Sequence, residues 1–151
     1  MDITLIAVGK LKEPFFREAS DYFSRQLSKL GRFQIIEIKD EKTDEHNSSN
    51  QNEAIKNREG KALLKQIPPR SYIIALAIDG VMKDTRGFSE ILHRYSNQPL
   101  VFLIGGSLGL SEEVLKKAHM RLSFSPMTFP HQLMRILFLE QLVTALSLER
   151  S

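Results

Sequence analysis

The sequence lacks cysteine and any long run of apolar residues, and both absences narrow the class of protein. Without cysteine the chain forms no disulfide and no thiolate metal site, which is compatible with a reducing cytoplasm. No apolar run approaches the ~18 residues of a membrane-spanning helix. The first residues, MDITLIAVGK, have an acid at position 2 and no cleavage-site pattern, unlike a signal peptide. We therefore expect a cytoplasmic protein with no membrane partner.

A strong excess of charge of one sign is also lacking. The formal net charge of +3 permits a nucleic-acid partner without requiring one. The four histidines have no HxxxH or HExxH spacing, so we expect no bound metal. With 151 residues, 42% of them hydrophobic and 26% charged, the chain has the length and composition of one globular domain, residues 1–151.

Short apolar segments alternate with helical patterns along the chain, which is typical of an α/β fold with a mostly parallel sheet flanked by helices. We expect strands at 3–8, 33–38, 72–78, 100–104 and 121–124, and helices at 14–30, 53–66, about 85–95, 112–118 and 130–148. The strand YIIALAI is apolar on both faces, so it should be central and parallel, and Asp79-Gly80 should form the turn after it. Asp84 or Thr85 should cap the helix that follows.

Two further segments stand out. The segment from Lys39 to Asn52 has no apolar residue, so we expect a mobile surface loop, long enough for a functional role. The last predicted helix, from Pro130 to about Leu148, has little polar face. A helix that is apolar nearly all round is buried on more than one side. At the end of a small domain, this pattern favours burial against a second subunit.

The candidate site lies where the strand 100–104 runs into Gly105 and Gly106, with Gly109 three residues later. Ligands of α/β proteins bind beyond the carboxyl ends of strands, and glycine lets the backbone approach a bound molecule. From the pattern alone, these glycines are either tight-turn residues, the more common role, or ligand contacts. The sequence GGSLG matches no common phosphate motif, and two glutamates after the helix cap Ser111 would repel a phosphate. A neutral or cationic ligand fits better.

Two residues of the last helix are candidates for chemistry. His131 follows Pro130 at the helix start, beside the candidate site, where it serves either in packing and capping or in catalysis. Arg135 lies one turn further along the same face. An arginine in so apolar a helix indicates a substrate phosphate, an intersubunit ion pair, or both. His93 and His119 are expected on helices as surface residues.

Two motifs, FLIGGSLGLSEEVLKKA and LSFSPMTFPHQLMRILFLEQL, resemble the ribosomal RNA large-subunit methyltransferase H family, small members of the knotted SPOUT methyltransferase class. The segments ITLIAVGKLKEPFFREASDYFSRQL and FQIIEIKDEK fit the same family, so the resemblance spans nearly the full chain. It implies an α/β fold whose C-terminal part threads a trefoil knot, a topology that periodicity does not supply. It also implies a homodimer through the C-terminal helix, S-adenosylmethionine as methyl donor, and N3 of a pseudouridine in the large-subunit (23S) ribosomal RNA of assembled ribosomes as acceptor.

The resemblance also implies roles for particular residues. The cofactor pocket would comprise Leu76, Gly105, Gly106, Phe124, Ser125, Pro126, Met127, Thr128 and Phe129. His131 and Arg135 match the family's PHxxxR pattern and are the candidate catalytic residues. His131 would shape the site or assist loss of the N3 proton. Arg135 would contact the RNA or the second subunit.

The sequence departs from the family pattern in three ways. Ala77 stands where an acid is usual, Val143-Thr144-Ala145 replaces YRA, and the sequence ends in SLERS without a tail that contains tyrosine, histidine and a basic residue. The tail difference leaves a second hypothesis open, a dimeric cofactor-binding or ribosome-binding homologue with impaired catalysis. The intact GGSLGLS and SFSPMTFPH motifs count against a generic nucleotide-binding protein without methyl transfer.

Overall fold

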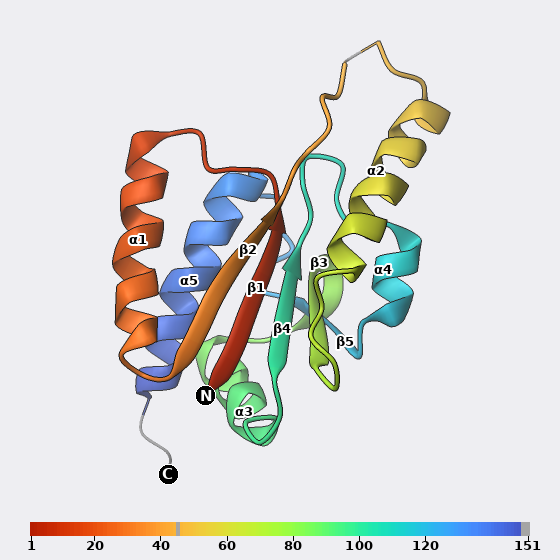
Figure 1. Cartoon of the computed structure of the whole chain (residues 1–151). Coiled ribbons are helices and arrows are strands. Elements are labelled where there is room, and N and C mark those ends of the chain that lie inside the picture. Colours follow the sequence, from red (N-terminus) through yellow and green to blue (C-terminus); the bar gives the residue numbers. More distant parts are fainter. Residues whose placement is uncertain (45, 149–151) are drawn as a thin grey trace.

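The computed structural model describes residues 1–44 and 46–148, and its strands and helices alternate as the sequence predicts (Figure 1). The five strands are β1 (Asp2–Val8), β2 (Arg32–Ile38), β3 (Tyr72–Met82), β4 (Leu100–Ile104) and β5 (Met120–Ser123). The five helices are α1 (Pro14–Ser28), α2 (Ser49–Leu64), α3 (Thr85–Arg94), α4 (Glu112–Lys117) and α5 (His131–Ser147). Within the described residues, no helix is long and apolar enough to cross a membrane.

The strands form one parallel sheet in the order β2-β1-β4-β3-β5. Helices cover both faces: α5 packs against α1 and α3 on one face, and α2 packs against α4 on the other (Figure 1). All strand carboxyl ends lie at the same edge because the strands are parallel. The loop after β4, which contains the paired glycines, therefore lies beside the ends of its neighbours β1 and β3.

Alternate residues of the central strands supply two separate hydrophobic cores. Along β4, residues 100, 102 and 104 face the core completed by α1, α3 and α5, whereas residues 101 and 103 face the core completed by α2 and α4. A strand buried on both faces is apolar at every position, which explains the unbroken run LVFLI. The larger core is centred on Phe88, Phe102 and Phe138, whose ring centroids lie 4.8 to 6.1 Å apart.

The predicted turn at Asp79-Gly80 is wrong, because β3 continues to Met82. Pairing between β3 and β5 shifts register between Leu76 and Val81, so residues 77–80 bulge out of the ladder. Glycine at position 80 permits the close approach of β5. A Cβ there would lie 2.6 Å from the carbonyl carbon of Arg121. The predicted central position of this strand is confirmed, since β3 lies between β4 and β5.

The start of α2 also differs from the prediction, because the helix begins at Ser49 inside the segment expected to be a loop. The side chain of Ser48 accepts a hydrogen bond from the Gln51 amide at 3.2 Å, and the Gln51 side chain accepts one from the Ser48 amide at 2.6 Å. This reciprocal capping box starts a helix whose first turn is entirely polar. In the shortened connection, residues 39–48, Glu45 lies outside the described residues.

Capping elsewhere follows the sequence. Asp84, and not Thr85, caps α3, because its Oδ1 accepts a hydrogen bond from the Gly87 amide at 2.8 Å. Ser111 caps α4 as expected, through a bond from the Val114 amide at 3.3 Å. The other predicted boundaries lie within a few residues of those in the structure.

Candidate active site

A cavity opens at the carboxyl ends of β4 and β5 and at the bulge of β3, between the glycine-containing loop and the segment 124–129 that leads into α5. It encloses about 740 Å³, part of it open to solvent. Seven of the nine residues predicted to hold a cofactor line it: Leu76, Gly105, Phe124, Ser125, Met127, Thr128 and Phe129. Gly106 and Pro126 are not among the lining residues. The cofactor role of all nine residues stays a prediction.

The glycine-containing loop is a tight turn that also forms one wall of the cavity. The Gly109 amide donates a hydrogen bond to the Gly106 carbonyl at 3.0 Å, which closes the turn. Gly109 has a φ of +81°, a left-handed conformation that favours glycine. A Cβ on Gly105 would lie 2.6 Å from the carbonyl carbon of Gly109, so the two sides of the loop are in contact. Gly105 and Gly109 face the cavity, whereas Gly106 faces Val8 of β1.

The nine residues predicted to hold the cofactor leave out several residues that line the cavity. Ile104 and Gly109 belong to the stretch that the sequence marked as the candidate site, and the others are Ala77, Ile78, Leu110, Leu122, Ser123 and Met134. Ala77 and Ile78 reach the cavity because they belong to the bulge in β3. The only signal for this bulge is Gly80, a glycine within an otherwise strand-like segment, which is also the ordinary signal for a turn.

The segment 124–129 is held in shape by local hydrogen bonds and by the half-buried ring of Phe124. The Ser123 hydroxyl donates to the Ser125 carbonyl at 2.9 Å, and the Ser125 hydroxyl accepts from the Met127 amide at 3.0 Å. The ring of Phe124 packs edge-on against Phe88, with centroids 5.1 Å apart. Met127, by contrast, is 68% exposed at the rim of the cavity. The wall is thus preformed, and Met127 adds an apolar side chain to its rim.

His131, the first residue of α5, lines the cavity and is half-buried. Burial lowers the pKa of its imidazole, and the cations Arg135 and Lys12 lower it further, against a smaller opposing effect of Asp40. The ring is therefore neutral at neutral pH, and one of its nitrogens is able to accept a proton. The position and the pKa direction are compatible with the predicted catalytic role, which remains a prediction.

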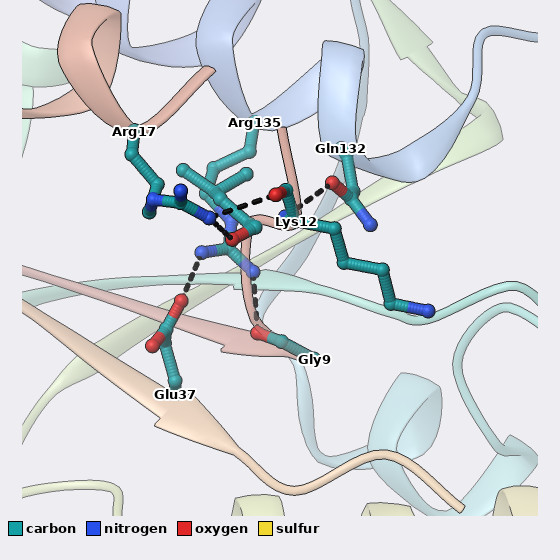
Figure 2. A network of polar contacts seen from close by, with 7 residues as sticks. Gly9, Lys12, Arg17, Glu37, Gln132 and Arg135 are labelled. Atoms are coloured by element: carbon teal, nitrogen blue, oxygen red, sulfur yellow. Dashed lines mark hydrogen bonds and ion pairs between the residues drawn. The ribbon is translucent and has the colours of Figure 1, made fainter. Parts of the chain in front are cut away.

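Arg135 lies one turn beyond His131, but its guanidinium is turned into the protein. Its side chain is 2% exposed. Nη1 donates to Glu37 Oε2 of β2 at 2.6 Å, and Nη2 donates to the Gly9 carbonyl at 2.7 Å (Figure 2). Within the described residues, its Nε has no hydrogen-bond partner. The predicted RNA or dimer contact stays a prediction, and within this chain Arg135 joins α5 to β1 and β2.

His119 does not lie on a helix, contrary to the prediction, because α4 ends at Lys117. Its Nδ1 accepts a hydrogen bond from the Ile73 amide at 2.9 Å, and its own amide donates to the Ile73 carbonyl at 2.8 Å. The imidazole ring also stacks on Tyr72, with centroids 4.9 Å apart. His119 therefore fixes the start of β5 against β3, at the amino-terminal ends of the strands and away from the cavity. His93 lies on α3 and is exposed, as predicted.

One buried acid lies on the other side of the glycine-containing loop. Glu59 of α2 is 6% exposed, and its Oε2 accepts a hydrogen bond from the Glu41 amide at 3.1 Å. Burial raises the pKa of this carboxyl, against the opposing effect of that hydrogen bond. Its Oε1 would lie 3.8 Å from a Cβ on Gly106, so Glu59 connects the 39–41 segment to the loop after β4. In the described part of the chain, no group of three His, Asp or Glu side chains is arranged to hold a metal.

Comparison with known proteins shows which family the chain belongs to. The family model described as "Predicted SPOUT methyltransferase" matches residues 1–151, so the chain belongs to this family. Its relatives include proteins named "Ribosomal RNA large subunit methyltransferase H". The one from Clostridium kluyveri is 46% identical over 145 residues, 94% of this chain and 91% of that protein. The one from Alkaliphilus oremlandii is 45% identical over 149 residues, 97% of this chain and 94% of that protein. The family resemblance of the two motifs is thereby confirmed.

Solved structures support the fold. A probable methylase family protein from Haemophilus influenzae has a TM-score of 0.52 and 17% identity, over 99% of this chain and 70% of that one. A protein described as hypothetical has a TM-score of 0.53 and 14% identity, over 98% of this chain and 68% of that one. At these identities the likeness concerns the fold alone, and it agrees with the parallel α/β architecture.

Proposed function

We propose that this protein uses S-adenosylmethionine to methylate N3 of a pseudouridine in the large-subunit (23S) ribosomal RNA of assembled ribosomes. The observation that carries the proposal is the preformed cavity at the glycine-containing loop of a SPOUT family member. The relatives that share nearly half of its residues over almost its whole length are named as ribosomal RNA methyltransferases. The acceptor position and the cofactor are inferred from the family resemblance.

The chemistry of the cavity lining fits S-adenosylmethionine. Apolar side chains such as Leu76, Leu110 and Phe129 suit the adenine ring, and the hydroxyls of Ser125 and Thr128 suit the polar groups of the cofactor. Among residues 1–44 and 46–148, no lysine or arginine lines the cavity, so no fixed cation of the described lining repels the sulfonium. When bound, the cofactor supplies an electrophilic methyl group. The residues around it then have to hold the acceptor nitrogen in line with that group.

His131 is the residue proposed to take the proton from N3. The acceptor nitrogen carries a proton near neutral pH, and methylation requires its loss. A neutral imidazole at the cavity wall is able to accept it, and the lowered pKa of His131 keeps the ring neutral. Arg135 acts in this proposal by holding α5 in place, because its guanidinium is committed to Glu37 and Gly9.

We also propose that residues 1–151 form a single domain that dimerises through α5. Leu133 and Leu137, one turn apart on α5, are only half-buried and belong to neither hydrophobic core. An apolar pair of this kind on a helix surface is suited to contact a second copy.

The family resemblance is also the ground on which we propose a trefoil knot in the C-terminal part of the chain. A knotted chain pulled from its two ends would stop short of its full contour length in single-molecule stretching.

Transfer of labelled methyl from S-adenosylmethionine to ribosomes that lack this modification tests the proposal. We expect incorporation at a pseudouridine of the large-subunit RNA, located by mass spectrometry of nuclease fragments. A His131→Gln variant should bind the cofactor with unchanged affinity in calorimetry and lose most of the transfer. Cofactor binding by the unaltered protein without any transfer would instead identify the impaired homologue, the second hypothesis from the sequence.

A further inference from the structure

The loop that joins β1 to α1, residues 9–13, lies against the start of α5. The Gly9 amide donates to the Ile38 carbonyl of β2 at 2.6 Å, and Gly9 takes a φ of +97° as the chain leaves the sheet. The Lys12 amide donates to Gln132 Oε1 at 3.0 Å. Gln132 directly follows His131, so this loop adjoins the residue that lines the cavity.

Two guanidinium groups, that of buried Arg135 and that of exposed Arg17, bind carbonyl oxygens of the loop backbone. Arg135 Nη2 donates to the Gly9 carbonyl at 2.7 Å, and Arg17 Nη1 donates to the carbonyls of Leu11 at 3.2 Å and Lys12 at 2.7 Å (Figure 2). Leu11 is 6% exposed, so its side chain anchors the middle of the loop. A surface loop with three of its carbonyls bound in this way presents its remaining side chains from fixed positions.

The side chains presented are lysines. Lys10 and Lys12 line a groove together with Lys39, which directly follows β2, and all three are exposed. Figure 2 shows the Lys12 side chain extending away from the guanidinium network. With respect to residues 1–44 and 46–148, none of the three ammonium groups forms an ion pair. The groove also contains Glu37, whose carboxylate already binds Arg135, and Asp40.

We propose that this groove, formed by Lys10, Lys12 and Lys39, binds phosphates of the RNA substrate next to the cavity. The inference rests on the proposed function and adds to it the surface that holds the RNA. Three cations without an ion pair in the described part of the chain, against the one acid Asp40 that is not bound to Arg135, give the groove a local positive charge, although the whole chain has a net charge of only +3. Lysine ammonium groups bind phosphates as point charges. Arg135 and Arg17 are positioning residues here, since they bind the loop backbone.

The test is the salt dependence of binding to ribosomes that lack the modification. The groove variant is Lys10→Gln/Lys12→Gln/Lys39→Gln. The matched control is Lys29→Gln/Lys65→Gln/Lys117→Gln, which removes the same charge from exposed lysines at the C-terminal ends of α1, α2 and α4. In a parallel α/β sheet, these helix ends lie at the edge opposite to the cavity.

We expect the groove variant to bind about tenfold or more weakly at ~0.1 M salt, and the slope of log affinity against log salt to fall by about 2 to 3. The control should keep the slope of the unaltered protein, and calorimetry should give all three proteins the same affinity for S-adenosylmethionine. Equal slopes for the groove variant and the unaltered protein would overturn the inference while leaving the methyltransferase proposal intact. Failure of the unaltered protein both to bind and to methylate ribosomes would overturn the proposed function itself.

Discussion

Single glycines set the shape of the cavity by allowing backbone segments to touch. Gly80 lets β3 rejoin β5 after its bulge, since a Cβ there would lie 2.6 Å from the Arg121 carbonyl carbon. Gly105 lets the loop after β4 fold onto Gly109 at the same separation. In both cases the neighbouring atom belongs to the backbone, which cannot move aside by changing a rotamer. The two glycines are therefore specific requirements of the cavity wall.

Replacing Gly105 with alanine should open the loop and damage the cavity. We expect Gly105→Ala to lower the free energy of unfolding by about 1–3 kcal/mol, the usual range for overpacking. Cofactor affinity, measured by calorimetry, should fall about tenfold or more, because Gly105 lines the cavity. The control is Gly87→Ala on α3, where a Cβ would meet flexible side-chain atoms of Lys83 at 3.1 Å. An unchanged affinity for Gly105→Ala would show that the loop serves only as a turn.

The titration of His131 makes a second test at the residue scale. NMR should place the pKa of its imidazole below 6.5, because burial and the neighbouring cations favour the neutral ring. The unfolded chain then binds more protons than the folded protein between the folded pKa and about 6.5. The free energy of unfolding is therefore not reduced by His131 above about pH 6.5, and it falls as the pH drops toward the pKa of the folded protein, because the half-buried ring resists protonation. A His131→Gln variant should lose less stability than the unaltered protein between pH 7.5 and pH 5. A pKa at or above 6.5 would contradict the environment described.

At the scale of elements, α5 is joined to the sheet by one buried cation. Arg135 binds Glu37 of β2 and the carbonyl of Gly9, where β1 ends, so a single guanidinium links three elements. From the sequence, Arg135 stood out because charge is rare in so apolar a helix. Its partners could not be predicted, because Glu37 is 98 residues away in the chain. Burial of a charge is tolerated only with such pairing.

Removal of this cation should destabilise the fold. We expect Arg135→Ala to lower the free energy of unfolding in urea by about 3 kcal/mol, the low end for a broken buried pair, since Glu37 is 38% exposed and regains water. Arg135→Lys should recover only part of this, because one ammonium lacks the fork that reaches both acceptors. The double variant Arg135→Met/Glu37→Gln should be more stable than Arg135→Met or Glu37→Gln alone. If the losses in free energy of unfolding of these two single variants simply add up in the double variant, the ion pair contributes nothing.

At the scale of the whole molecule, the sequence predicted the order of elements and the edge of the sheet at which the cavity opens. Both follow from local signals: apolar runs such as LVFLI, helix caps such as Ser111, and glycines at a strand end. The bulge in β3 and the early start of α2 were missed, because Gly80 also reads as a turn and the first turn of α2 has no apolar residue. The sheet order and the contacts of Arg135 join distant segments, so no local pattern contains them.

The proposed dimer depends on the outer face of α5, and the structure identifies which residues test it. Leu142 is fully buried in the core, so a charge there would unfold the domain and say nothing about association. Leu137 is half-buried and outside both cores, so Leu137→Asp should leave unfolding cooperative. If α5 forms the interface, light scattering should give the unaltered protein twice the 17.3 kDa chain mass and the variant the chain mass itself. Thr144→Asp, an exposed position on the same helix, controls for added charge. A folded Leu137→Asp variant that keeps the dimer mass would move the interface to another surface.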